Sequence, residues 1–282
     1  MGEGPERPLR PMPDQLTTSP PTAATHDRKH ALPTINRPLF RLFHWYTRRF
    51  ARKHFHTIRI ASDGYPPSID SATPIIICMN HPGWWDPLLA LVLSQHQWPG
   101  RRHYAPIDAA MLEKYRFFRK LGFFGIDRQS RAGGSAFFKT ASRIAAMPNT
   151  CLWITAQGRF ADPRQRPVEL AAGLSRLAER CERAVVLPLA IEYPFWTERE
   201  PEALVRFGTP CDVQSGERAI DDALAATMDA LAADAVAKDA SRFDVILRGS
   251  AGSSATYDAW RWMKAKATGR QFSAAHMEDV KA

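Results

Sequence analysis

A short apolar segment, followed by a turn and the start of a helix, is the feature that most constrains how this chain can fold. Residues 75–79 (Ile-Ile-Ile-Cys-Met) are continuously apolar and rich in β-branched side chains, which is typical of a strand buried on both faces of a parallel sheet. A Pro-Gly turn comes next, and Asp86 and Pro87 are expected to cap and begin a helix. The pattern predicts an α/β fold and places His81 just past the carboxyl end of a buried strand, where open α/β sheets bind ligands.

His81 and Asp86 are a candidate pair for proton transfer. Imidazole side chains have an ordinary pKa near about 6.5, so they can accept a proton near neutral pH. A carboxylate bonded to one ring nitrogen fixes the tautomer and stabilises the imidazolium. Five residues along a regular helix would separate the two side chains by about 140°, whereas across a turn they can meet. The alternative, equally open from the spacing, is that Asp86 only caps the helix and that His81 is a turn residue.

Three further segments follow the first and complete an ordered set of four. The segments are Asn80-His-Pro-Gly-Trp-Trp-Asp86, Gly122-Phe-Phe-Gly-Ile-Asp-Arg128, Ile154-Thr-Ala-Gln-Gly-Arg159 and Val186-Leu-Pro-Leu-Ala-Ile191. In this order they resemble the sequence blocks of the glycerolipid acyltransferase family, whose bacterial prototype is 1-acylglycerol-3-phosphate acyltransferase. The first segment has the Asn-His-x-x-x-x-Asp pattern and is the most specific. The resemblance covers roughly residues 75 to 210.

The resemblance implies both a fold and a reaction. The implied fold is α/β, with a mixed, largely parallel central sheet flanked by helices and preceded by an amphipathic N-terminal helix. The implied reaction moves a fatty acyl group from acyl-CoA or acyl carrier protein to the hydroxyl of a lysophospholipid-type acceptor, and neither a cofactor nor a metal is expected. His81 would be the general base, and Asp86 would orient it. The implied substrate-binding residues are Asn80, Arg128, Gln157, Gly158 and Arg159.

Gln157 departs from the family pattern, which usually has glutamate in a Phe-Pro-Glu-Gly-Thr-Arg segment. A glutamine still forms hydrogen bonds, but it carries no negative charge to pair with a cation. This change leaves the acceptor open: a non-phosphate lipid hydroxyl, such as a lyso-ornithine lipid or a glycosylated isoprenoid, is an alternative. Two further alternatives are a thioester hydrolase and a non-catalytic, basic membrane-binding protein.

Composition and patterning divide the chain into four parts. Residues 1–35 contain many prolines and small polar residues and are expected to be a disordered tail. Residues 36–56 are expected to form a basic amphipathic helix, and residues 57–240 the acyltransferase domain. Residues 241–282 are expected to be an extension that packs on or beside this domain.

The basic helix has two interpretations that are compatible with each other. Its apolar face is expected to hold Leu39, Leu42, Phe43, Tyr46 and Phe50. Basic residues lie among them, and no acidic residue occurs between Asp27 and Asp63. This combination suits the surface of an anionic membrane, whereas the other interpretation is that the apolar face packs on the domain.

Charge, cysteine spacing and hydropathy indicate the partners and the cellular compartment of the protein. The formal net charge of +9 favours acidic partners such as anionic lipid, and no nucleic-acid-binding motif is present. The four cysteines are widely spaced and are expected to be reduced core residues. No apolar run is long enough to span a bilayer, and the N-terminus lacks an apolar signal core. The chain is therefore expected to be cytoplasmic and peripheral on the inner face of the membrane.

Three local expectations bear on the site and its surroundings. Residues 56–61 alternate and are expected to form an outer strand. Residues 110–120 are expected to form one basic helix. Gly133 and Gly134 are expected to open a helix whose free N–H groups suit an anion near Arg128.

Overall fold

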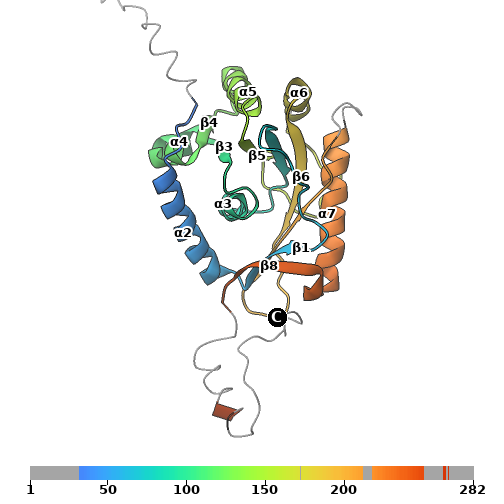
Figure 1. Ribbon diagram of the computed structural model, residues 1–282. Coiled ribbons are helices and arrows are strands. Elements are labelled where there is room, and N and C mark those ends of the chain that lie inside the picture. Colours follow the sequence, from blue (N-terminus) through green and yellow to red (C-terminus); the bar gives the residue numbers. More distant parts are fainter. Residues whose placement is uncertain (1–31, 172, 212–217, 251–262, 265, 267–282) are drawn as a thin grey trace, which may run out of the picture. The chain divides into compact units, whose positions relative to one another are not determined.

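An eight-stranded sheet forms the centre of the fold in the computed structural model, which describes residues 32–171, 173–211, 218–250, 263–264 and 266 (Figure 1). The strand order is β4-β3-β5-β2-β6-β7-β1-β8. The strands are β1 (Thr57–Ala61), β2 (Ile75–Met79), β3 (Arg102–Asp108), β4 (Phe123–Ile126), β5 (Thr150–Thr155), β6 (Val185–Glu192), β7 (Glu202–Phe207) and β8 (Phe243–Arg248).

Five neighbouring strands, from β4 to β6, run parallel to one another. β6 pairs with β7 in the antiparallel direction, β7 with β1 in parallel, and β1 with β8 in the antiparallel direction. The sheet is thus mixed and largely parallel, as expected. β2 lies in the middle and every one of its residues is buried, which explains its continuous run of apolar side chains.

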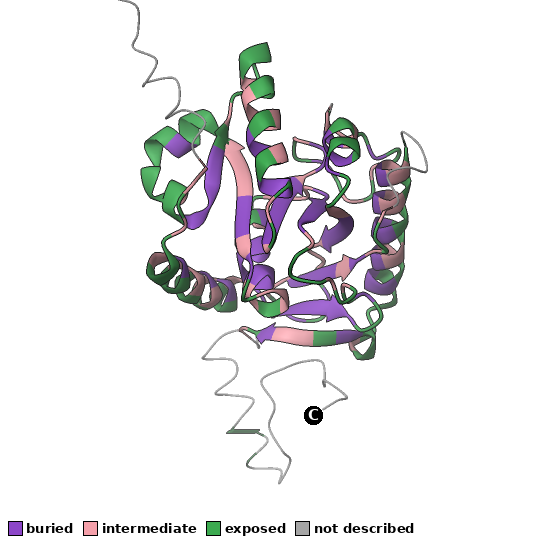
Figure 2. Ribbon diagram, turned by 45° about the horizontal axis from the view of Figure 1, so that its top comes forward, coloured by how far each residue is buried: buried purple, intermediate pink, exposed green. Residues whose placement is uncertain are grey.

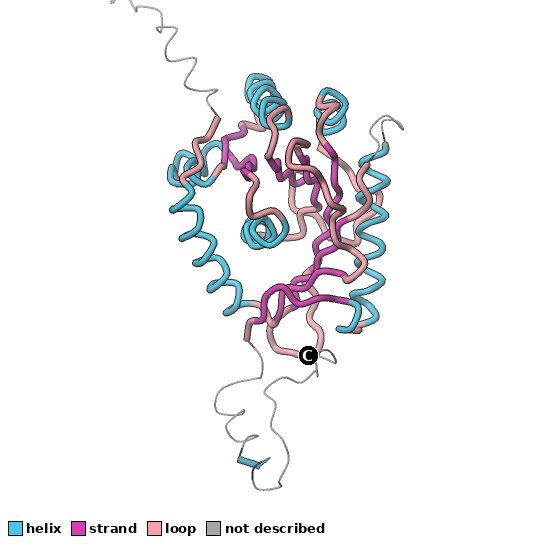
Figure 3. Tube along the Cα trace, in the orientation of Figure 1, coloured by secondary structure: helices cyan, strands magenta, loops and turns pink. Residues whose placement is uncertain are grey.

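Helices cover both faces of the sheet (Figures 1 and 3). The side chains of α5 (Arg131–Ala145), α6 (Leu174–Arg180) and α7 (Ala219–Ala237) bury their apolar faces in one core. α2 (Arg37–His54) and α3 (Asp86–Gln97) contribute to the core on the other face. Short helices complete the fold: α4 (Ala109–Lys114) and the 3₁₀ helices η1 (Arg116–Leu121) and η3 (Ala240–Arg242). No helix in the described part of the chain combines the length and the hydropathy needed to cross a bilayer.

The expectation that residues 56–61 form an outer strand is wrong. β1 lies between β7 and β8, and all five of its residues are buried. The strand that covers its edge is β8, residues 243–248, which the sequence pattern left in the C-terminal extension. In the rest of that extension, the structure describes only residues 241–242, 249–250, 263–264 and 266. Residues 1–31 of the expected tail lie outside the described residues.

The expected helix over residues 110–120 is divided in two. α4 ends at Lys114, Tyr115 adopts a non-helical conformation (φ −120°, ψ 68°), and the chain continues as η1. The apolar side chains of Leu112 and Leu121 are both buried beside β4. A single straight helix would not hold both on this core, because nine residues place side chains on opposite helix faces.

A buried charged cluster joins the start of β1 to the start of β7. The carboxylate of Glu202, which is 1% exposed, accepts hydrogen bonds from His56 Nδ1 (2.6 Å), Arg59 Nε (3.2 Å) and the hydroxyl of Thr57. Arg59 is also 1% exposed, and its guanidinium lies 5.9 Å from the centre of the Trp196 ring. The alternating polar residues that suggested an outer strand are therefore satisfied inside the fold.

α2 packs on the domain through part of the expected apolar face, because Leu39 and Phe43 lie half-buried against the core that includes Phe40. Its buried residues are Phe40, Thr47 and Ala51. Leu42 and Tyr46, expected on the same face, are 61% and 50% exposed, and Figure 2 shows exposed residues along this helix. The helix therefore has one apolar surface that packs internally and a second that faces outward.

Candidate active site

The loop from β2 to α3 brings His81 and Asp86 together. His81 Nδ1 lies 2.5 Å from Asp86 Oδ2. Because a carboxylate can only accept, Nδ1–H is the donor and the lone pair of the imidazole is on Nε2. The His81 side chain is 15% exposed, whereas that of Asp86 is fully buried. The pair thus has the histidine at an accessible position and the carboxylate behind it, as in a general-base pair.

Three donors hold the Asp86 carboxylate. Oδ2 accepts from His81 and from the backbone N–H of Gly83 (3.2 Å), and Oδ1 accepts from the hydroxyl of Tyr193 (2.7 Å). Burial, followed by the charge and hydrogen bond of Asp86, raises the pKa of Tyr193 well above its ordinary value, so this hydroxyl remains a donor. A buried carboxylate with this many donors is fixed in position and compensated for its loss of hydration.

The expectation that Asp86 is the N-cap of the following helix is wrong by one residue. Trp85 is the N-cap and Asp86 is the first helical residue, with Pro87 next. The side chain of Asp86 turns toward His81 and Tyr193 and does not bond to N–H groups of α3. The alternative in which Asp86 only caps the helix is therefore excluded.

Tyr193 is a site residue that the sequence pattern did not identify. It follows directly after β6, and its hydroxyl reaches a residue 107 positions away in the chain. The position of β6 next to β2 brings the two together, with Met79 opposite Leu189. The neighbouring Val-Pro-Val-like segment predicted the strand but gave no indication that the residue after it contacts the pair.

Gln157 and Asn80 hold the backbone around His81. Gln157 is 6% exposed, and its Oε1 accepts a hydrogen bond from the N–H of His81 (3.0 Å). The amide of Asn80 donates to the carbonyl of Ile191 (2.9 Å) and accepts from its N–H (2.8 Å). These contacts link β2 to the ends of β5 and β6, so both side chains act on the position of His81.

The cations expected at the site differ in their surroundings. A Cβ built on Gly158 would lie 3.8 Å from Arg128 Nη1, so the exposed Arg128 lies beside this glycine. Gly158 has φ +64°, a conformation that favours glycine. Arg159 instead pairs with Glu169 at 2.8 Å, and both side chains are more than half exposed. The structure thus brings Arg128 next to the Gln157-Gly158 turn, while Arg159 forms a surface ion pair.

The expected start of the glycine-rich helix is also corrected. α5 begins at Arg131 with Ser130 as its N-cap. Ser130 accepts from the N–H of Gly133 through its hydroxyl (3.0 Å) and from that of Gly134 through its carbonyl (3.1 Å). These two N–H groups are therefore not available to an anion. Glycine is required at 133 because a Cβ there would lie 2.1 Å from the carbonyl oxygen of Asp127.

The backbone N–H groups of the catalytic loop and the ring of Phe160 lie close to His81. The N–H groups of His81 and Gly83 are both bonded, to Gln157 and Asp86, so they are not open to a developing oxyanion. Phe160 is 60% exposed, and its ring centre lies 4.4 Å from that of His81. The ring shields one side of the imidazole. Within the described residues, no group of three or more His, Cys, Asp or Glu side chains is arranged to hold a metal ion.

Comparison with known proteins is consistent with the four ordered segments. No curated protein matches the chain. Residues 59–192, which run from within β1 to the end of β6 and include His81, Asp86 and Gln157, match the family model described as Acyltransferase. This match, consistent with the glycerolipid acyltransferases, supports a general acyltransferase role for the domain.

Proposed function

We propose that this protein transfers a fatty acyl group from a thioester donor, acyl-CoA or acyl carrier protein, to the hydroxyl of a lysophospholipid-type acceptor. The observation that carries the proposal is the 2.5 Å contact between His81 Nδ1 and a fully buried Asp86. The contact leaves Nε2 as the basic atom on the accessible side of the ring.

The proposed reaction needs no nucleophile from the protein. His81 Nε2 takes the proton of the acceptor hydroxyl as its oxygen attacks the thioester carbonyl. The tetrahedral intermediate then breaks the carbon–sulfur bond, and the imidazolium returns its proton to the departing thiolate. Asp86 holds the ring orientation through both proton transfers and stabilises the cation that forms between them.

A turnover assay tests this function. Free thiol released from a long-chain acyl-CoA would be measured without acceptor, with lysophosphatidic acid, and with a total lipid extract. Release that depends on lysophosphatidic acid supports the proposal, and release only with the extract points to a non-phosphate lipid hydroxyl. Release without acceptor indicates a hydrolase. No release with either acyl-CoA or acyl carrier protein as donor would contradict the proposal and favour a non-catalytic, membrane-binding role.

Arg128 is proposed to bind the phosphate of the acceptor. Gln157 carries no charge, so the residue beside Gly158 does not neutralise the guanidinium of Arg128. A guanidinium binds a phosphate through two parallel hydrogen bonds. The neutral residue at 157 is therefore compatible with an anionic acceptor.

Arg128→Ala is expected to raise KM for lysophosphatidic acid by about tenfold or more, since hydrogen bonds to charged groups contribute about 1.5–3 kcal/mol. An acceptor without phosphate should lose much less. Arg159→Ala is the matched control, because Arg159 already pairs with Glu169 on the surface. An equal loss with both acceptors would show that Arg128 acts on the structure of the site and does not recognise phosphate.

Tyr193 is proposed to be a positioning residue that acts through Asp86. Tyr193→Phe keeps the ring and removes the 2.7 Å hydrogen bond to Oδ1. We expect kcat to fall roughly tenfold, as for the loss of one hydrogen bond to a charged group, with KM nearly unchanged and an altered pH–rate profile. Tyr65→Phe is the control, because Tyr65 is 40% exposed. A wild-type pH–rate profile for Tyr193→Phe would argue against this role.

An apolar cavity near the catalytic loop is the proposed entry for the acyl chain. Its volume is about 60 Å³, and its wall includes Met79 and Pro87, which lie on either side of the His81–Asp86 loop. Phe40 of α2 and Leu91 of α3 also line it. The cavity is smaller than one of about 150 Å³ that holds a benzene molecule, so a long chain would require α2 to move from α3.

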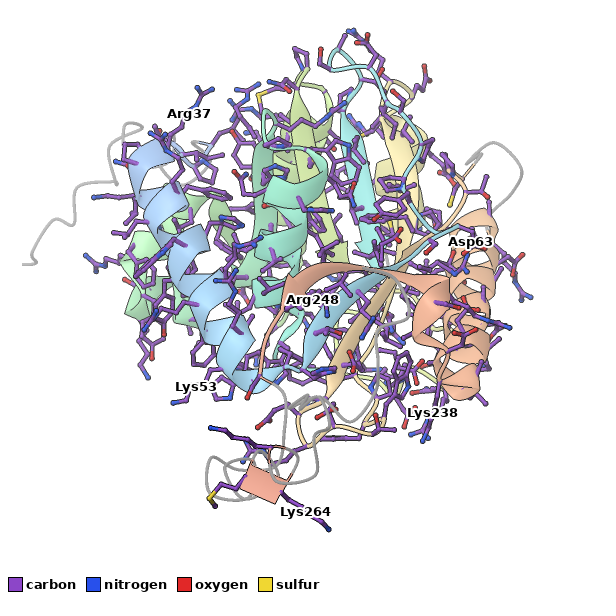
Figure 4. The ribbon with its side chains drawn as sticks, turned by 60° about the horizontal axis from the view of Figure 1, so that its bottom comes forward. Arg37, Lys53, Asp63, Lys238, Arg248 and Lys264 are labelled. Carbon is purple, nitrogen blue, oxygen red and sulfur yellow. The ribbon has the colours of Figure 1, made fainter. Side chains whose placement is uncertain are left out.

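The proposed location is the cytoplasmic face of an anionic membrane, with α2 as the contact. The helix carries six Lys or Arg residues and no acidic residue. Arg37 and Lys53 lie at its two ends (Figure 4). Each basic residue near an anionic surface contributes about 1 kcal/mol. Leu42, Trp45 and Tyr46 are 50–61% exposed and would enter the interface.

A further inference from the structure

The segment formed by α4 and η1 exposes large apolar side chains beside α2. Met111 is 44% exposed, Tyr115 38% and Phe117 40%. Neighbouring Leu112 and Leu121 fill the core under this segment, whereas these three side chains keep a large share of their surface exposed. Contiguous apolar surface of this kind marks a contact with another protein or with lipid.

A series of ring contacts joins this segment to the catalytic loop. The rings, in order, are Phe117, Phe43, Tyr46, Phe50, Trp85 and Trp84, with successive centroid separations of 5.8, 5.9, 5.9, 5.5 and 5.3 Å. Trp84, at one end, is 64% exposed and lies between His81 and Asp86 in the chain. The exposed rings of Phe117 on η1, Tyr46 on α2 and Trp84 in the catalytic loop are thus joined by one series of contacts.

The charge of this surface selects its partner. Residues 109–121 hold four Lys or Arg residues and one Glu, a net +3, and α2 holds six basic residues and no acid, a net +6. The two segments together carry +9, which equals the formal net charge of the whole chain. The remaining residues therefore sum to zero. Aromatic rings among concentrated basic residues fit an anionic bilayer, where the rings lie at the headgroup level.

We propose that α4 and η1 form a second lipid-contacting segment beside α2, so that one aromatic strip rests on an anionic bilayer. The strip consists of Leu42, Trp45, Tyr46, Trp84, Met111, Tyr115 and Phe117. Contact along the strip would place the His81–Asp86 loop at the interface, where the hydroxyl of a lipid acceptor lies. The inference rests on the proposed lipid acceptor and adds the surface by which the protein reaches it.

Vesicle binding by the full chain tests the second segment. The double variant Tyr115→Ser/Phe117→Ser should bind vesicles of phosphatidylcholine with phosphatidylglycerol about fivefold or more weakly, because less apolar area is buried in the interface. The matched control is Val236→Ser, since Val236 is 81% exposed on α7. Circular dichroism and the unfolding temperature establish that both variants are folded. Raising the salt concentration should weaken wild-type binding.

A fluorescent probe gives a second measurement that does not depend on affinity. The thiols of Cys78, Cys151 and Cys181 are buried and that of Cys211 is partly buried. An environment-sensitive fluorophore is therefore attached to Phe117→Cys or to Val236→Cys in a Cys211→Ser background, with the background protein alone to measure labelling of the other thiols. The probe at 117 should shift to shorter wavelength with anionic vesicles. The probe at 236 should not shift.

The outcomes separate this inference from the proposed function. If Leu42→Ser/Trp45→Ser weakens binding while the α4–η1 variant and the probe at 117 are unaffected, the second segment is overturned and α2 alone is the contact. If wild-type protein does not bind anionic vesicles, the proposal that the aromatic strip contacts a bilayer is overturned as well. Thiol release with detergent-dispersed lysophosphatidic acid would still test the transferase in either case.

Discussion

Alanine in place of His81 is expected to lower the rate of acyl transfer by about 10²–10⁴-fold, the usual contribution of a general base. The variant removes the imidazole that, in the proposed mechanism, takes the proton of the acceptor hydroxyl. Asp86 keeps its hydrogen bonds from Gly83 and Tyr193, so the loop should remain folded. The loss should therefore appear in kcat, while vesicle binding and the unfolding temperature change little.

His96→Ala is the matched control for this variant, because His96 is an exposed histidine on the same helix as Asp86. It should keep wild-type turnover. His81→Gln should be as inactive as His81→Ala, since an amide can form hydrogen bonds but cannot take up a proton near neutral pH. Turnover of the alanine variant near the wild-type rate would sink the proposed mechanism, whatever the acceptor.

Glu202→Gln is expected to destabilise the fold by about 3–5 kcal/mol, the usual effect of breaking a buried ion pair by removing one charge. The change keeps the size of the side chain and removes the carboxylate that accepts from His56, Thr57 and Arg59. At roughly 2–4 °C per kcal/mol for a domain of this size, the unfolding temperature should fall by about 6–20 °C. Glu200→Gln, in the partly exposed pair with Arg199, should change it by at most a few degrees.

The stability that Glu202 provides should depend on pH. Burial raises the pKa of this carboxyl, but hydrogen bonds from His56 and Thr57 and the charge of Arg59 outweigh it, so the pKa is lowered. The folded-state pKa is then below that of the unfolded chain, near about 4.3. The contribution is complete above that value and is lost as the pH falls through the folded-state pKa. The difference in unfolding temperature between wild type and Glu202→Gln should therefore shrink below about pH 4, and a constant difference would contradict this assignment.

Local sequence predicted the elements on which the site is built. The apolar run at 75–79 could only be satisfied by a strand buried on both faces, and the turn after it brought His81 and Asp86 within contact. Periodicity was sufficient to predict the strand, whereas turn chemistry made the contact between His81 and Asp86 possible and left the helix-cap alternative open. The N-cap assignment failed because Tyr193, far away in sequence, takes part in fixing the Asp86 side chain.

The position of β1 and the role of its polar residues were decided by tertiary structure. Arg59 and Thr57 look like outward-facing residues in the sequence, but Glu202, opposite Thr57 on β7, accepts hydrogen bonds from both inside the fold. β8, from a part of the chain with no strong pattern, then covers the edge. A strand's neighbours are set by long-range pairing, which alternation within the strand does not encode.

The sequence by itself determined the α/β class and the central strand, because both follow from short-range patterns of apolar residues and turns. It gave His81 and Asp86 as a candidate pair, and the contact between them was decided by the structure. Only the tertiary structure decided that Gln157 holds the His81 backbone and that Arg159 is paired with Glu169 while Arg128 lies beside Gly158. The contacts between the aromatic rings of α2, η1 and the catalytic loop were likewise decided only by the tertiary structure. These contacts connect residues from different strands and helices, and the packing of the sheet and its helices determines which side chains meet.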